Sequence, residues 1–250
     1  MGRQYIDPVL FTRLLQAPLR CSAAALPTQC AICHDWSDAR ICGRCRQRFG
    51  AVAPRCESCA LRVPYGAARC GDCIKRPPPF NRTLTAFDYA HPWDGLITKL
   101  KFHAALDLAP ALARCLADAW AASAWPRPGL LLPVPLSPER LRHRGYNQAW
   151  EIARRLARRL RCDADARLLL RIKDTPHQLA FPPERRAANV RGAFAVEPTR
   201  RNELRGREVT LVDDVMTTGA TALEMVEVLR QAGAAQVNVW VLARTPAPGA

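Results

Sequence analysis

Eight of the eleven cysteines in this 250-residue chain form four Cys-x-x-Cys pairs within one short stretch. The pairs are Cys30/Cys33, Cys42/Cys45, Cys56/Cys59 and Cys70/Cys73. Two residues between the cysteines allow a tight turn to direct both thiolates at one metal ion, and two such turns complete a tetrahedral Cys₄ site. The spacing therefore predicts structural Zn²⁺, with two ions shared by the eight cysteines.

The stretch that carries these pairs is too short, and too rich in Pro, Gly and Arg, to bury a core of its own. Zinc would supply the missing folding free energy, on the order of 10 kcal/mol per structural site. A redox or disulfide function needs only one such pair and is the alternative, and another thiophilic metal could replace zinc. The spacing leaves sequential and cross-braced pairing open, and it gives Cys21 no role.

Several classes of protein are excluded by what the sequence lacks. No run approaches the roughly 20 apolar residues that span a bilayer, and residues 1–8 do not resemble a signal peptide. We therefore expect a cytoplasmic protein without a membrane span, where thiols stay reduced. The sequence also contains no Walker loop, no glycine-rich dinucleotide fingerprint and no Ser-His-Asp set.

A stiff Pro-rich linker, Lys75 to Phe80, divides the chain. We expect three regions: an N-terminal helical segment over residues 1–25, a metal-binding segment over 26–76 and a larger domain over 80–246. In the larger domain strand and helix patterns alternate, which predicts an α/β fold with a parallel sheet flanked by helices. Strands are expected at 83–90, 130–136, 168–172, 208–212 and 236–242, and helices at 106–122, 148–161 and 221–231.

One predicted strand end carries the sharpest motif in the larger domain. The apolar strand 208–212 leads into Asp213 and Asp214, and a helix follows from Thr221. The residues expected to bind phosphate and ribose offer backbone amides, three hydroxyls and a glycine that leaves room for the ligand: Val215, Met216, Thr217, Thr218, Gly219, Ala220 and Thr221. Such a loop before a helix N-terminus can hold a phosphate, and two carboxylates suit ribose hydroxyls or a hydrated Mg²⁺. The alternative, an ordinary turn with an acidic helix cap, explains neither the adjacent acids nor the three threonines.

Positive charge is concentrated between residues 127 and 207, where 19 Lys and Arg stand against 8 Asp and Glu, while the chain as a whole carries +15. Within it, several polar and basic side chains follow a predicted strand end and are candidates to contact pyrophosphate: Arg140, Arg142, Arg144, Asn147 and Gln148. Asn147 and Gln148 could instead begin the next helix, and the arginines could be a solvated face. A GC-rich genome would also favour Arg, so the net charge alone identifies no partner.

The strand-end motif matches the phosphoribosyl pyrophosphate signature of type I phosphoribosyltransferases. Further segments, Leu100–Phe102, Pro133–Gln148, Thr175–Gln178 and Arg185–Phe194, resemble the ComF/GntX family, and the cysteine pairs resemble its double zinc ribbon. The resemblance covers about residues 20–245. It implies a type I phosphoribosyltransferase fold behind the ribbon and a part in natural competence, the uptake or processing of DNA.

Two functions follow from that resemblance. One is a phosphoribosyltransferase with an unknown acceptor, which binds phosphoribosyl pyrophosphate with Mg²⁺ and uses Asp213 and Asp214 to fix the ribose. The other is a non-catalytic binding module for single-stranded DNA that reuses the fold, through its ribbons and an Arg-rich helix. A nucleoside 5′-phosphate fits the same loop, and other DNA-uptake proteins are further expected partners.

Overall fold

The computed structural model of this chain describes residues 27–50, 53–173 and 191–247. The expected N-terminal helical segment, with Cys21, lies outside the described residues. So do residues 175–178 and most of 185–194, which contributed to the resemblance.

The described chain begins with short elements around the cysteines and continues as alternating strands and helices. The strands are β1 (Thr28–Gln29), β2 (Trp36–Ser37), β3 (Thr83–Asp88), β4 (Leu130–Pro133), β5 (Leu169–Arg171), β6 (Phe194–Val196), β7 (Glu208–Met216) and β8 (Gln236–Arg244). The helices are α2 (Gly43–Phe49), α3 (Gly71–Lys75), α4 (Trp93–Phe102), α5 (Ala109–Ala122), α6 (Pro138–Arg144), α7 (Gln148–Leu160) and α9 (Ala220–Gln231), with 3₁₀ turns η1 (Leu106–Leu108) and η3 (Pro198–Leu204).

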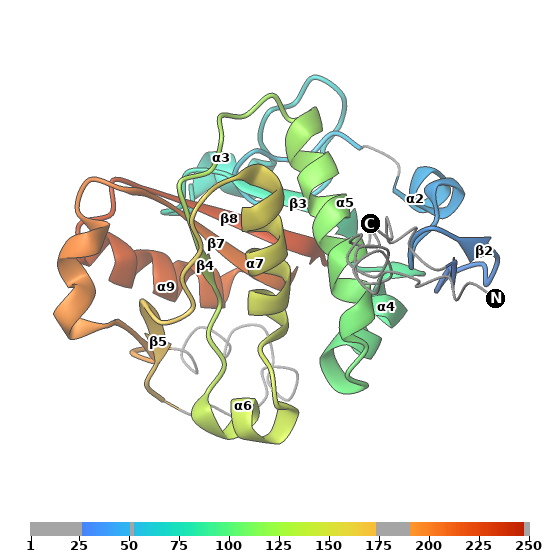
Figure 1. The fold of residues 1–250 in the computed structure, drawn as a ribbon. Coiled ribbons are helices and arrows are strands. Elements are labelled where there is room, and N and C mark those ends of the chain that lie inside the picture. Colours follow the sequence, from blue (N-terminus) through green and yellow to red (C-terminus); the bar gives the residue numbers. More distant parts are fainter. Residues whose placement is uncertain (1–26, 51–52, 174–190, 248–250) are drawn as a thin grey trace, which may run out of the picture.

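A four-stranded parallel sheet in the order β3-β8-β7-β4 forms the centre of the molecule (Figure 1). Helices α5 and α7 pack on one face, and α9 packs on the other. The predicted α/β fold with a helix-flanked parallel sheet is confirmed.

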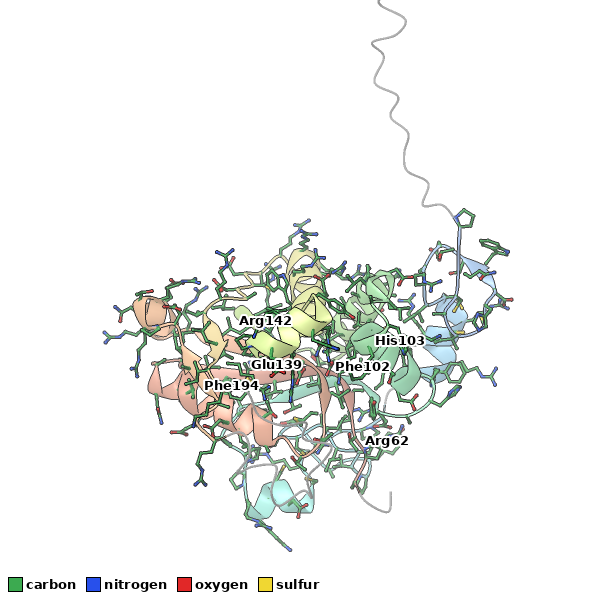
Figure 2. All side chains as sticks on the ribbon, turned by 90° about the horizontal axis from the view of Figure 1, so that it is seen from below. Arg62, Phe102, His103, Glu139, Arg142 and Phe194 are labelled. Atoms are coloured by element: carbon green, nitrogen blue, oxygen red, sulfur yellow. The ribbon has the colours of Figure 1, made fainter. Side chains whose placement is uncertain are left out.

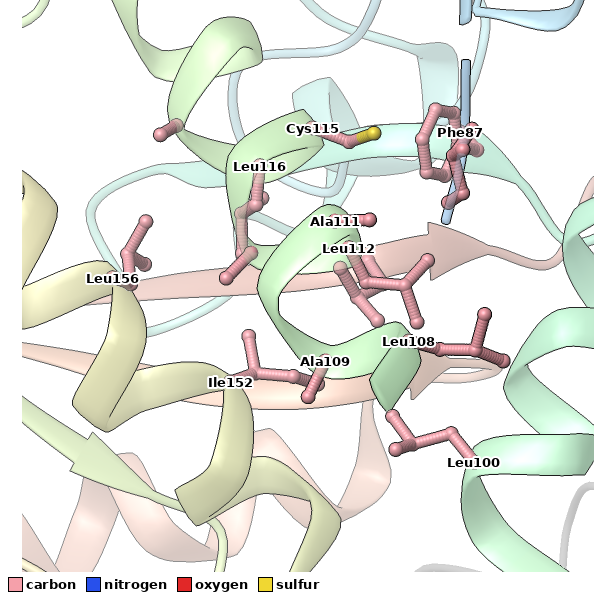
Figure 3. Close-up of a cluster of buried hydrophobic side chains, with 14 of the residues drawn as sticks. Phe87, Leu100, Leu108, Ala109, Ala111, Leu112, Cys115, Leu116, Ile152 and Leu156 are labelled. Atoms are coloured by element: carbon pink, nitrogen blue, oxygen red, sulfur yellow. The ribbon is translucent and has the colours of Figure 1, made fainter. Parts of the chain in front are cut away.

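The strands of this sheet are apolar on both sides because both faces are covered by helices. On β7, Val212 points into the cluster under α5 and α7, while Leu211 points into the cluster under α9. Figure 3 shows the hydrophobic cluster under α5 and α7, where Leu112 and Leu116 of α5 pack beside Ile152 and Leu156 of α7. This two-sided core fixes where β7 ends, and therefore where the strand-end motif lies.

The cysteine-rich region packs directly against the larger domain. Ile41 is 1% exposed and belongs to the same buried cluster as Phe87 and Trp93. The Trp93 indole Nε1 donates to the Phe49 carbonyl at 2.9 Å, and the Arg46 guanidinium pairs with Asp118 at 2.9 Å. The linker therefore connects two regions that share a hydrophobic core.

Some element boundaries differ from those expected from the sequence. β7 continues to Met216 instead of ending at Val212, because β8 pairs with it through Met216. Residues 169–171 join β6 in a separate antiparallel pair outside the main sheet. Helices α4 and α6 were not predicted; each is short, and the polar N-cap of α6, Ser137, follows a proline-rich stretch.

Within the described ranges, no helix is both long and apolar enough to cross a bilayer.

Candidate functional site

A cleft of about 260 Å³ opens at the carboxyl ends of the parallel strands. Strands β3, β4 and β7 deliver residues to it at or just beyond their last positions: Tyr89, Val134 and the segment from Asp213 onward. Ligands of open parallel sheets bind at this edge. Every residue from Asp213 to Thr221 lines the cleft except Thr218.

The two adjacent carboxylates belong to the last part of strand β7 and not to a loop. The two carboxylates lie close to each other and to the Lys101 ammonium, which both of them influence. Both line the cleft, two and three residues before the strand ends at Met216. The Asp214 amide donates to Asp213 Oδ1 at 2.8 Å, which holds the first carboxylate in place.

Asp214 is the most deeply buried of the cleft's charged groups, with 3% exposure. Its Oδ1 pairs with the ammonium of Lys101 at 2.9 Å. Its Oδ2 is also buried, and it has no hydrogen-bond partner in the described structure. A buried carboxylate oxygen without a donor is costly, so this atom favours a ligand that brings a hydroxyl or a cation.

The three charges of this group influence one another. Burial and the neighbouring Asp214 carboxylate raise the pKa of Asp213 to about 8. Burial alone would lower the pKa of Lys101, but the carboxylates of Asp214 and Asp213 outweigh it and raise that pKa. Lys101 therefore stays an ammonium ion, and Asp213 can accept or release a proton near neutral pH.

The loop between β7 and α9 comprises only Thr217, Thr218 and Gly219. The sequence pattern predicts a loop of six residues, from Val215 to Ala220, and is wrong on this length. Gly219 has a φ of +83°, in the left-handed region, and directly precedes the first residue of α9. The chain thereby turns so that the N-terminus of α9 faces the cleft, where its amides and partial positive charge favour an anion.

The threonines of this loop do not share one position. Thr217 and Thr221 line the cleft, whereas the Thr218 hydroxyl accepts from the Ala220 amide at 3.4 Å. A Cβ on Gly219 would meet only Met216 Sδ, at 3.8 Å. A side chain there is disfavoured by the positive φ rather than by lack of space.

Three of the five candidate pyrophosphate contacts line the cleft: Arg140, Arg144 and Gln148. Arg144 lies over the Phe102 ring at 5.2 Å and donates to the Gln148 amide oxygen. Arg142 does not line the cleft; its Nε donates to the Pro138 carbonyl at 3.3 Å. Figure 2 shows Arg142 on α6 and Phe102 at the end of α4.

Asn147 begins helix α7, which is one of the two interpretations that the sequence allows. Its Oδ1 accepts from the amides of Ala149 and Trp150, and its Nδ2 donates to the Val134 carbonyl. All its polar atoms are thus used locally, in the usual manner of an N-cap.

Several cleft residues were given no role by the sequence pattern. Lys101, Phe102, Tyr89 and Arg171 all line the cleft. In the sequence, Lys101 and Phe102 belong only to a segment that carries the family resemblance. One signal could have found Lys101: it follows Ile97 by four positions and so shares the buried face of α4.

The eight paired cysteines form two separate clusters, Cys30/Cys33/Cys42/Cys45 and Cys56/Cys59/Cys70/Cys73, each with its four sulfurs within 4.8 Å of one another. Sequential pairing is therefore what the structure shows, and the cross-braced alternative is wrong. Sulfur pairs lie 3.8 Å apart in the first cluster and 3.6 Å apart in the second. A tetrahedral zinc ion with Zn–S bonds of about 2.3 Å needs sulfurs about 3.8 Å apart, so both clusters could bind zinc.

Backbone amides lower the pKa of one thiol in each cysteine cluster. Burial alone would raise the pKa of Cys30, but hydrogen bonds from the amides of Cys42, Cys33 and Ile32 lower it to about 6. In the second cluster, amide hydrogen bonds overcome burial in the same way and lower the pKa of Cys56 to about 7. Each cluster therefore holds one thiol that readily becomes the thiolate that zinc requires.

Comparison with known proteins agrees with this division of the chain. Residues 147–249 match the phosphoribosyl transferase domain family. The match begins at the N-cap of α7 and contains the strand-end motif, whereas Lys101 and the cysteine clusters precede it.

Curated relatives match nearly the whole chain. The DNA utilization protein YhgH of Escherichia coli strain K12 is 33% identical over 236 residues, which cover 93% of this chain and 100% of the relative. Competence protein F of Haemophilus influenzae is 33% identical over 208 residues, covering 82% of this chain and 90% of that protein. Competence protein ComFC of Bacillus subtilis is 25% identical over 219 residues, covering 83% and 85%.

Proposed function

This chain belongs to the ComF/GntX family, in which cysteine clusters precede a phosphoribosyltransferase domain, and from that premise we propose that its strand-end cleft binds phosphoribosyl pyrophosphate or a nucleoside 5′-phosphate. The relatives' names place those proteins in competence and DNA utilization. We propose the same setting for this chain, with other DNA-uptake proteins as partners.

The buried Asp214 carboxylate carries the proposal. One of its oxygens is paired with Lys101 and the other has no donor among the described residues. A ribose hydroxyl would donate to that second oxygen. Beside it, Asp213 has a pKa near neutrality and can accept from the neighbouring hydroxyl.

The remaining parts of the cleft suit the phosphates. The 5′-phosphate would accept from the first amides of α9 and from the hydroxyls of Thr217 and Thr221. Arg140 and Arg144 also line the cleft, where cations would offset the charge of a leaving pyrophosphate. In the transferase reaction the bond from C1′ to the pyrophosphate oxygen breaks, and a bond from C1′ to a nitrogen of the acceptor forms.

Mg²⁺ would enter with the substrate. Carboxylate and phosphate oxygens are the ligands it prefers, and Asp213 and Asp214 offer the former. The ion would neutralise the pyrophosphate, while Lys101 already supplies one positive charge beside Asp214.

Calorimetric titration with phosphoribosyl pyrophosphate and Mg²⁺ tests the proposal. Wild type should bind, and Asp214→Asn should weaken binding by about 1–3 kcal/mol for a lost charged hydrogen bond. Thr217→Val should weaken it by about 1 kcal/mol or more. Thr218→Val, one residue further on the same loop, should have less effect, because Thr218 does not line the cleft. Absence of binding by wild type, or equal losses in both threonine variants, would refute this use of the loop.

A second function, binding of single-stranded DNA, is favoured by the exposed side chains. Arg158 and Arg159 are exposed on α7, and the described structure pairs neither with a carboxylate. The ribbon region adds exposed aromatic rings, Trp36 at 70% and Tyr65 at 90% exposure. Cationic side chains contact backbone phosphates, and exposed rings stack on bases. A turnover assay with candidate bases would separate a transferase from a purely DNA-binding protein.

A further inference from the structure

Arg244, the last residue of β8, is a buried cation that no motif predicted. It is 7% exposed. Its guanidinium donates to four backbone carbonyls: Cys59 at 2.9 Å, Met216 at 3.1 Å, Thr245 at 2.8 Å, and Thr217. One side chain thus connects the second cysteine cluster with the loop that begins the phosphate site.

The charge of Arg244 has no carboxylate partner within ion-pair distance in the described part of the chain. A buried guanidinium needs a compensating charge or complete hydrogen bonding. Its Nε donates to the carbonyl of Cys59, a ligand of the second cluster. A divalent ion held by four thiolates leaves that cluster with a net negative charge, which suits a neighbouring cation.

The other side of the guanidinium holds the ligand loop. Met216 is the last residue of β7 and Thr217 the first residue of the loop. Arg244 donates to both of their carbonyls, and the Met216 carbonyl also accepts from the Thr245 amide at 3.0 Å. Arg244 therefore fixes the course of the chain directly before Thr217 and Gly219 enter the cleft.

The turn of the second cluster is also hydrogen-bonded to β3. The Thr83 hydroxyl donates to the Ser58 carbonyl at 2.6 Å, and the Thr83 amide donates to the Glu57 carbonyl at 2.8 Å. A change in the Cys56–Cys59 turn is thus transmitted to β3 and to Arg244. The first cluster has different neighbours: Arg40 pairs with Asp107, and Arg46 pairs with Asp118.

We propose that Arg244 is a positioning residue that couples metal occupancy of the second cluster, and not of the first, to the affinity of the strand-end cleft for a phosphorylated ribose. This inference rests on the proposed function. Loss of the metal removes the charge that compensates Arg244 and loosens the turn that accepts its Nε hydrogen bond. The guanidinium then no longer holds the Met216 and Thr217 carbonyls, and the loop loses its preorganised form.

Two matched cysteine variants test the coupling. Cys70 is the N-cap of α3 in the second cluster, and Cys42 is the N-cap of α2 in the first. Serine is a good N-cap, so Cys70→Ser and Cys42→Ser remove a metal ligand at equivalent positions. Elemental analysis confirms the loss of one ion from each. Calorimetry with phosphoribosyl pyrophosphate and Mg²⁺ should show affinity reduced roughly tenfold in Cys70→Ser, a typical coupling between sites. The reduction in Cys42→Ser should be clearly smaller.

A double-mutant cycle separates coupling from general damage. Arg244→Met should weaken binding about as much as Cys70→Ser, and the double variant should be no weaker than Arg244→Met alone. Arg244→Lys keeps the charge but lacks the fork that reaches several carbonyls, so it should not restore affinity. Additive effects of Arg244→Met and Cys70→Ser would overturn the proposal.

Two readouts do not depend on turnover. By reciprocity, phosphoribosyl pyrophosphate should slow zinc loss to a chelator from the second cluster, measured in Cys42→Ser, more than from the first, measured in Cys70→Ser. Hydrogen exchange at Thr217–Gly219 should be faster in Cys70→Ser than in Cys42→Ser without any ligand. If wild type binds nothing, the proposed function fails, and the exchange rates still decide the coupling: equal rates in the two variants overturn it.

Discussion

At the scale of single residues, the cleft is organised by buried charges. Asp213, Asp214 and Lys101 lie together where β7 ends, and two carboxylates face one ammonium ion. Such an arrangement costs folding free energy, since charges leave water without full compensation. Sites that bind charged ligands commonly retain strain of this kind.

The raised pKa of Asp213 predicts that the free energy of unfolding depends on pH. Its ordinary value of 3.8 rises to about 8 in the fold. Between these values the native state binds more protons than the unfolded state, so wild type loses stability as pH rises from about 4 to 8. Asp213→Asn removes the titration and can still accept from the Asp214 amide. The variant should therefore gain stability over wild type with rising pH, by at most about 1.4 kcal/mol per pH unit. Urea denaturation at pH 5 and pH 8 measures this, and a constant difference would contradict it.

Removal of Lys101 should destabilise the protein. Lys101→Met leaves the buried Asp214 carboxylate without its cation, at a cost of about 3 kcal/mol. Lys99→Met, on an exposed position of the same helix, should change stability by less than about 0.5 kcal/mol. Combining Lys101→Met with Asp214→Asn should recover part of the loss. Equal stability of the two lysine variants would show that the pair contributes nothing.

At the scale of elements, the long apolar strands and the amphipathic helix α7 could be predicted from the sequence, because their periodic patterns are strong. The position of Asp213 and Asp214 at a strand end, followed by a helix, could be predicted as well. The predicted loop is too long because Val215 and Met216 give no sign that β8 continues to pair with them. The ion pair of Lys101 could not be predicted, because it depends on how α4 packs across the sheet.

The two cysteine clusters should hold two zinc ions per chain, and loss of the first should weaken the whole fold. Ile41 next to the first cluster is buried in the core that contains Phe87 and Trp93. From the sequence alone, the Pro-rich linker predicts that Cys30→Ser unfolds only the ribbon. With a shared core, Cys30→Ser should instead lower the melting temperature of the larger domain. Elemental analysis tests the zinc content, and calorimetric melting tests the effect on stability. An unchanged melting temperature of the larger domain in Cys30→Ser would show that the cysteine-rich region folds independently of it.

At the scale of the whole molecule, the positive charges differ in how available they are to a partner. Of four arginines on α7, Arg154 and Arg155 pair with Glu151, and Arg158 and Arg159 are exposed. Counting basic residues in the sequence therefore overstates the cationic surface of this helix. The availability of each charge depends on its neighbours one helical turn away.

Binding of single-stranded DNA should depend on the two exposed arginines. Replacing Arg158 and Arg159 with Gln should weaken binding and reduce the dependence of affinity on salt, by about 0.7 in slope for each phosphate that is no longer neutralised. Arg154→Gln is the matched control, because its charge is already paired with Glu151. Fluorescence anisotropy from low to high salt gives both quantities. An unchanged slope would identify this face as solvated surface.

The central claim is that a phosphorylated ribose binds at the carboxyl ends of β7 and its neighbours. A crystal structure with a nucleoside 5′-monophosphate tests it most directly. We expect the phosphate against the first amides of α9 and the hydroxyl of Thr217, and a ribose hydroxyl within hydrogen-bond distance of Asp214 Oδ2. A nucleotide bound on the exposed face of α7 or on the ribbons, with an unaltered Lys101–Asp214 pair and nothing in the cleft, would contradict it.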